Sequence, residues 1–183
     1  MLLYLVRHTH AVTEEENPVR PLSDRGRADA TRIAAFLRAA GACHPAQVWH
    51  SPLVRARETA QRFAAGIGGE TLLVETSDLL PDDDPSDIAH RLAEYPATHD
   101  LALVGHEPHL SALGTLLVRG RKKPIAFALR KGAVVALERD ERVHKKSGLP
   151  RWRVRWHFSP ELLPPALPPP APAPESPVIV PEI

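Results

Sequence analysis

Short apolar segments alternate with longer segments of helical periodicity along the first two thirds of the chain. Leu2 to Val6 is a continuous apolar run that predicts a buried strand, and it ends abruptly at Arg7-His8. Three similar strands are expected at Gln47 to His50, Thr71 to Glu75 and Asp100 to Gly105. Alternation of strands and helices is typical of a mainly parallel sheet with helices on both faces. The pattern therefore predicts an α/β fold, a three-layer α/β/α sandwich.

Four helices fit the segments between and after these strands. The first should be capped by Ser23 or Asp24 and stopped by Gly41, and one of its faces carries apolar residues at i, i+3, i+4 and i+7 (Ala30, Ile33, Ala34, Leu37). The second should begin at Ser51-Pro52, a capping serine followed by a proline in the first turn. The expected helical ranges are about 24–40, 52–65, 85–94 and 109–118.

The C-terminal third follows a different pattern. Val134 to Glu138 and Trp152 to Phe158 predict two further strands, joined by a polar turn over Asp140 to Pro150. From Ser159 onward, ten of the chain's 20 prolines fall within 25 residues, a composition that disfavours packed structure. We therefore expect one domain over residues 1–158 and an extended proline-rich tail over 159–183.

Length and composition support a single globular domain. With 183 residues and 43% hydrophobic content, the chain can bury one core. It has no apolar run of 18 residues and no signal-peptide pattern, so we expect a soluble cytoplasmic protein without a membrane partner. Cys43 is the only cysteine, and we interpret it as a packing residue.

Charge is distributed unevenly along the chain. The net charge is +1, yet residues 119–155 hold thirteen Lys and Arg against three Asp and Glu. A basic segment can attract nucleic acid, but this one carries few aromatic residues, and alternating arginines are more often the solvated face of a strand. The segment therefore does not favour a nucleic-acid partner.

Candidate chemistry collects at the ends of three strands. Arg7-His8 follows the first strand, Ser51 to Arg55 follows the second, and His106 follows the fourth. Loops at the carboxyl ends of parallel strands share one crevice, so these residues should converge. A helix N-terminus and two arginines suit a phosphoryl group. One histidine could then attack phosphorus while the other stabilises charge on an oxygen.

These residues resemble the motifs of the histidine phosphatase, or phosphoglycerate-mutase-like, superfamily. The similar segments are Leu5-Val6-Arg7-His8-Thr9, Ser51-Pro52-Leu53-Val54-Arg55-Ala56-Arg57-Glu58-Thr59-Ala60 and Gly105-His106, in matching order and spacing. Three further features look most like the small phosphohistidine phosphatase branch, the SixA type: Arg20-Pro21-Leu22-Ser23-x-x-Gly26, Gly105-His106-Glu107-Pro108 and the strand Trp152 to Phe158. The resemblance covers about residues 1 to 158.

The resemblance implies a phosphatase that works through a phosphohistidine intermediate. His8 would be the phosphorylated nucleophile, Arg7 and Arg55 would bind phosphate, and His106 would complete the pocket. No metal or cofactor is implied. The substrate would be a phosphohistidine on a phosphotransfer protein or a small phosphorylated molecule. Thr9 stands where the motif most often has glycine.

Several assignments stay open at the level of sequence. Thr9, Arg20 and Ser51 are candidate substrate contacts. The proton donor could be Asp78, could be Glu107, or could be absent, and Asp78 is better placed by its order along the chain. Three adjacent acids, Asp82 to Asp84, are more typical of a solvated loop than of a metal site. The alternatives to a phosphohistidine phosphatase are a metabolite phosphatase, a mutase and a non-catalytic phosphate-binding module.

Overall fold

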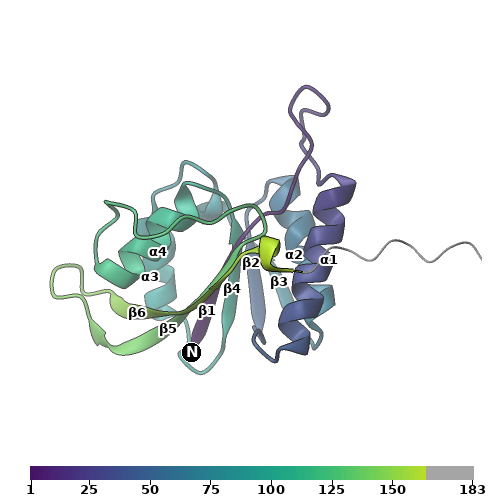
Figure 1. The fold of residues 1–183 in the computed structure, drawn as a ribbon. Helices are drawn as coiled ribbons and strands as arrows, with labels where there is room; N and C mark the ends of the chain where they lie inside the picture. Colours follow the sequence, from purple (N-terminus) through teal and green to yellow (C-terminus); the bar gives the residue numbers. More distant parts are fainter. Residues whose placement is uncertain (164–183) are drawn as a thin grey trace, which may run out of the picture.

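The computed structural model describes residues 1–163. Its strands and helices follow one another as β1 (Leu2–Arg7), α1 (Asp24–Ala39), β2 (Gln47–His50), α2 (Val54–Ile67), β3 (Leu72–Glu75), α3 (Pro85–Glu94), β4 (Leu101–Gly105), α4 (His109–Arg119), β5 (Val134–Val143) and β6 (Pro150–Phe158). Two single turns of 3-10 helix are added, η1 (Ser77–Leu79) and η2 (Pro160–Leu162). Figure 1 shows this arrangement.

The strands form one sheet in the order β3-β2-β4-β1-β5-β6. The four strands from β3 to β1 are parallel, whereas β5 and β6 run antiparallel to their neighbours. The predicted mainly parallel α/β/α sandwich is confirmed. The last two strands are longer than predicted, because their pairing continues through register shifts as far as Val143 and Pro150. The long polar turn predicted over Asp140 to Pro150 is therefore wrong in extent.

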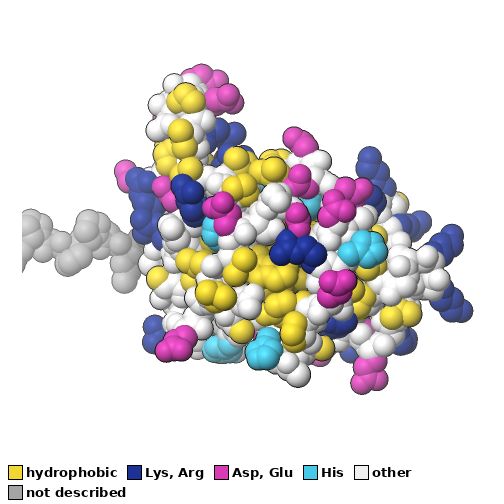
Figure 2. All heavy atoms as spheres, turned by 180° about the vertical axis from the view of Figure 1, so that it is seen from behind, with side chains coloured by type: hydrophobic (Ala, Val, Ile, Leu, Met, Phe, Trp, Pro, Cys, Tyr) yellow, Lys and Arg dark blue, Asp and Glu magenta, His cyan; other side chains and the backbone are white. Residues whose placement is uncertain are grey.

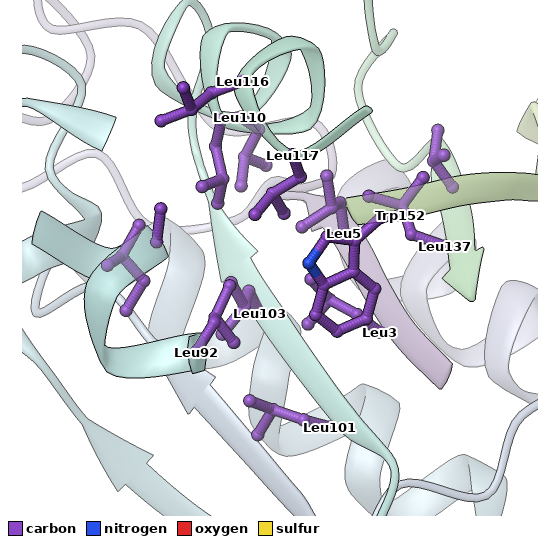
Figure 3. Packing of buried hydrophobic residues seen from close by; sticks show 14 of the residues in the cluster. Leu3, Leu5, Leu92, Leu101, Leu103, Leu110, Leu116, Leu117, Leu137 and Trp152 are labelled. Atoms are coloured by element: carbon purple, nitrogen blue, oxygen red, sulfur yellow. The ribbon is translucent and has the colours of Figure 1, made fainter. Parts of the chain in front are cut away.

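Helices cover both faces of the sheet (Figure 1). Alternate residues of β1 point to opposite faces: Leu3 and Leu5 pack with α3 and α4, while Tyr4 and Val6 pack with α1 and α2. Figure 3 shows Leu3 and Leu5 among the leucines of the first cluster, beside Trp152. Burying one such side chain contributes about 1.5–3 kcal/mol to the free energy of folding. The two clusters therefore fix the positions of the parallel strands and of the residues at their carboxyl ends.

The helix boundaries confirm one predicted cap and correct another. Ser23 caps α1, its side chain accepting a hydrogen bond from the Gly26 amide. Ser51, by contrast, is not the cap of α2, which begins at Val54 after Leu53. Ser51 instead accepts a long hydrogen bond of 3.3 Å from the Leu53 amide. The Ser51 hydroxyl also lies 2.9 Å from His106 Nε2, so it faces the residue that follows β4.

The end of the described chain departs from the expected extended tail. Pro160 to Leu162 form the turn η2, and Leu163 packs against the cluster under α1. The rest of the predicted proline-rich tail lies outside the described residues. Cys43 is buried, as expected for a packing residue. None of the helices in residues 1–163 is long and apolar enough to cross a membrane.

Candidate active site

His8 lies immediately beyond β1 with its ring held in one orientation. Its backbone amide donates to the Gly105 carbonyl of β4 at 3.0 Å. Its Nδ1 lies 2.7 Å from the Thr9 carbonyl oxygen. A carbonyl oxygen can only accept, so Nδ1 carries the proton and the lone pair stands on Nε2. The side chain is only 6% exposed.

His106 follows β4 and faces the same space as His8. The two ring centroids are 5.0 Å apart. His106 Nε2 lies 2.9 Å from the Ser51 hydroxyl oxygen, which joins the residue after β2 to the residue after β4. Its Nδ1 is buried and has no hydrogen-bond partner within the described part of the chain. A buried ring nitrogen of this kind calls for a polar partner.

Arg7 is braced from the loop that connects α4 to β5. Its Nη1 donates to the Leu129 carbonyl at 2.7 Å. The amide of the same Leu129 donates to Glu107 Oε1 at 3.0 Å. Glu107 also accepts from the Ser111 hydroxyl at 2.6 Å. The carboxylate beside His106 therefore holds the backbone segment that orients Arg7, and the Nε of Arg7 is left buried without a partner in residues 1–163.

A second backbone contact joins this loop to the two residues at the end of β1. The Gly132 amide lies 3.1 Å from the Arg7 carbonyl oxygen and 3.2 Å from that of His8. Gly132 has a φ of 77°, a region that favours glycine. A Cβ atom there would come within 3.0 Å of Pro160 and 3.3 Å of Thr9. The residue before it, Lys131, is thereby fixed beside the crevice.

The charges of Arg7, Arg55 and Lys131 act on the histidine pair, and the charge of Arg20 acts on Arg55 and Lys131. Arg55, half-buried in the first turn of α2, has its pKa lowered by burial and by the charge of Arg20. The pKa of Lys131 is lowered by burial and by the charges of Arg7, Arg20 and Arg25. Because the charges of Arg7 and Arg20 help to lower these pKa values, we group Arg7, Arg20, Arg55 and Lys131 as the cations of one site. Lys131 was missed by sequence reasoning, because nothing in its local pattern distinguishes it from the other basic residues of the segment.

The same surroundings keep both histidines neutral. Burial is the main cause that lowers the pKa of His8 to about 3, and the charges of Arg55, Arg7 and Lys131 act in the same direction. Burial, followed by the charges of His8 and Arg55, lowers the pKa of His106 to about 3 as well. At neutral pH the Nε2 lone pair of His8 is therefore available for attack on an electrophile.

Arg20 sits at the base of a protruding loop between β1 and α1. The loop rises above the sheet (Figure 1), and acidic side chains lie at its tip (Figure 2). Its base is closed by the isolated bridge between Ala11 and Leu22. Arg20 adopts a φ of 53°, and its Nε reaches the Val12 carbonyl only at 3.4 Å. The charge of this guanidinium contributes to the lowered pKa of Arg55.

Thr9 turns its polar atoms toward α2. Its amide donates to Thr59 Oγ1 at 3.2 Å, and its hydroxyl lies 3.4 Å from the same atom. Thr59 donates in turn to the Arg55 carbonyl at 2.7 Å. The threonine at the motif's usual glycine position thus links β1 to the helix that carries Arg55.

The remaining acidic candidates are engaged elsewhere. Asp78 forms an ion pair with Arg91, whose guanidinium also donates to Thr76. Asp84 caps α3 and pairs with Lys122. No group of three or more His, Cys, Asp or Glu side chains in residues 1–163 could hold a metal ion.

Comparison with known proteins gives a sequence match and a fold match. The family model of the histidine phosphatase superfamily (branch 1) matches residues 3–82. A solved structure of the protein histidine phosphatase SixA complexed with tungstate superposes with a TM-score of 0.73 at 21% identity, covering 87% of this chain and 97% of that one. A putative phosphohistidine phosphatase SixA from Agrobacterium tumefaciens gives 0.67 at 20% identity, covering 86% and 97%.

A third solved structure has the same fold and another substrate in its name. The mycobacterial glucosyl-3-phosphoglycerate phosphatase complexed with VO3 superposes with a TM-score of 0.62 at 19% identity, covering 86% of this chain and 98% of that one. At identities this low, the structural matches establish the fold alone. No curated protein matches the sequence.

Proposed function

We propose that the chain is a member of the histidine phosphatase superfamily, whose family model matches residues 3–82, and that it hydrolyses phosphoryl groups through a covalent phosphohistidine on His8. One observation carries this proposal. The hydrogen bond between Nδ1 and the Thr9 carbonyl leaves the His8 lone pair on Nε2, beside a second histidine and inside a group of cations. A site that only bound phosphate would gain nothing from an unprotonated nitrogen nucleophile.

In the first step, His8 Nε2 attacks phosphorus and the bond from phosphorus to the leaving group breaks. Arg7 and Arg55 neutralise the phosphoryl oxygens, with the guanidinium fork of Arg7 aligned by Leu129. The unpartnered Nδ1 of His106 can donate to one of these oxygens when Ser51 donates to Nε2. Water then attacks phosphorus, releases phosphate and restores His8.

The preferred substrate class in this proposal is a phosphoramidate, such as phosphohistidine on a protein. An alkoxide leaving group needs a proton from an acid, whereas an imidazole can leave already protonated. The acidic candidates near the histidines are both engaged, Asp78 by Arg91 and Glu107 by Leu129 and Ser111. A site without a free acid suits the phosphoramidate better than an alkyl phosphate ester.

The test is to follow the phosphoryl group. Purified protein would be mixed with a phosphohistidine peptide, with p-nitrophenyl phosphate and with an alkyl phosphate, and each reaction quenched within milliseconds. We expect an acid-labile phosphoryl group on His8 with the first two and the slowest turnover with the alkyl ester. An active enzyme that never carries phosphate would exclude the covalent mechanism, and faster turnover of the alkyl ester would exclude the substrate class.

A further inference from the structure

We propose that a hollow beside the phosphoryl site binds an acidic side chain of the phosphorylated protein substrate. This inference rests on the proposed function and specifies its substrate further. The hollow has a volume of about 510 Å³ and lies between α1, the end of the loop before β5, and the turn η2. Its polar lining is His10, Arg25, Asp29, Arg32, Arg130, Lys131 and Glu161.

Two lining residues of the hollow, His10 and Lys131, are close along the chain to residues that contact or form the catalytic site. His10 is two residues beyond His8, and its Nδ1 lies 2.8 Å from the hydroxyl oxygen of Ser23, the cap of α1. Lys131 directly precedes Gly132, whose amide lies against the carbonyl oxygens of Arg7 and His8. A peptide whose phosphorylated residue reached His8 would therefore have the hollow within reach of its neighbouring residues.

The charges of the hollow select an anion. Arg25 and Arg32 share Asp29, at 3.6 and 3.5 Å. Arg130 pairs with Glu161. Even with Arg32 left aside, the three cations Arg25, Arg130 and Lys131 outnumber the two carboxylates Asp29 and Glu161 among the described residues of the hollow.

Lys131 differs from the other three cations of the hollow, each of which contacts a carboxylate. No ion pair joins it to an acid in the described part of the chain, and the charges that act on it come from Arg7, Arg20 and Arg25. A carboxylate placed in the hollow would be attracted by all of these charges. The same carboxylate would be repelled by Asp29 and Glu161, so removing either acid should strengthen its binding.

The experiment compares two phosphohistidine peptides that differ only in flanking Asp and Glu or the matching Asn and Gln. The quantity measured is the ratio of their kcat/KM values, from which a general loss of activity cancels. We expect the wild type to prefer the acidic peptide by about 3- to 10-fold at low salt, in line with about 0.7–1.4 kcal/mol for a partly exposed charge contact. High salt should remove the preference.

Three variants test the assignment. Lys131→Gln should bring the ratio close to one, and Glu161→Gln should raise it above the wild-type value, an effect that damage to the fold could not produce. Lys145→Gln is the control, because Lys145 lies in the turn between β5 and β6, at the opposite end of the sheet from His8. A wild-type ratio of one, or an unchanged ratio in Lys131→Gln, would overturn the inference. Failure to hydrolyse either peptide would contradict the proposed substrate instead, and with it this subsite.

Discussion

The brace from Glu107 through Leu129 to Arg7 gives the sharpest prediction, because it separates a positioning role from an acid role. Glu107→Ala removes the acceptor for the Leu129 amide and for the Ser111 hydroxyl. Leu129 is buried, so its unpaired amide costs about 1–3 kcal/mol. The Leu129 carbonyl then no longer has a fixed place from which to orient the Arg7 guanidinium.

In Glu107→Ala we expect a loss of kcat/KM that the lower free energy of unfolding does not explain. If Arg7 contributes one fewer aligned hydrogen bond to the transition state, about 1.4–2.7 kcal/mol is lost, which is about 10- to 100-fold in kcat/KM. Tungstate is a tetrahedral oxyanion that should report the same loss as weaker inhibition. Glu107→Gln should recover most of the activity, because its amide oxygen can accept both hydrogen bonds.

Thr115→Val is a matched control, because Thr115 holds the same loop through a different contact. The Thr115 hydroxyl accepts from the Ala126 amide at 2.9 Å and donates to the Ser111 carbonyl at 2.6 Å, and neither hydrogen bond involves Glu107, Leu129 or Arg7. Thr115→Val should lower the melting temperature while kcat/KM stays within about threefold. Equal kinetic losses in Thr115→Val and Glu107→Ala would refute the brace. Loss in Glu107→Gln confined to alkyl esters would show that Glu107 is an acid instead.

Four further predictions concern the site. His8→Ala should abolish turnover and the acid-labile phosphoryl label, while the circular dichroism spectrum stays unchanged. Arg55→Lys should lower kcat/KM about 10-fold or more, because a point charge cannot replace the guanidinium fork. Asp78→Asn should leave the dependence of rate on leaving-group pKa unchanged, and a steeper dependence would restore Asp78 as the acid. The pKa values of about 3 for His8 and His106 mean that below pH 6.5 the unfolded chain binds protons that the native chain does not. Urea unfolding should therefore show stability falling as pH drops from 6.5 toward 3, by up to about 1.4 kcal/mol per pH unit for each histidine, and His106→Asn should make that slope shallower.

The sequence predicted the strands and helices better than the contacts between loops. The range Gln47–His50 was predicted to the residue, because the apolar pair Val48-Trp49 lies between Pro45 and Pro52, which leave room for only a short strand. The prediction of Ser51 as a helix cap was wrong, because its hydroxyl instead contacts the ring of His106, 55 residues away. No periodicity within a loop records a partner at that distance.

The same reason explains why the loop before β5 contributed nothing to the predicted site. Residues 120–133 have no regular hydrophobic period, and their position is set by Thr115, Glu107 and the end of β1. The hydrogen bond from Arg7 to Leu129 spans 122 residues. Lys131 could therefore be found only once the loop was seen to return across the strand ends.

These long-range contacts also decide how the site treats a leaving group. The proposed phosphate-binding residues are cations with few acid partners in residues 1–163, whereas the nearby acids Asp78 and Glu107 are each held by another group. In the proposed reaction these cations face the phosphoryl oxygens, and neither Asp78 nor Glu107 is free to supply a proton. An ester oxygen would leave such a site as an alkoxide, but a phosphohistidine imidazole can carry its own proton away. In the proposed function, the arrangement of loops, more than the nucleophile itself, is therefore the reason for a phosphoramidate substrate.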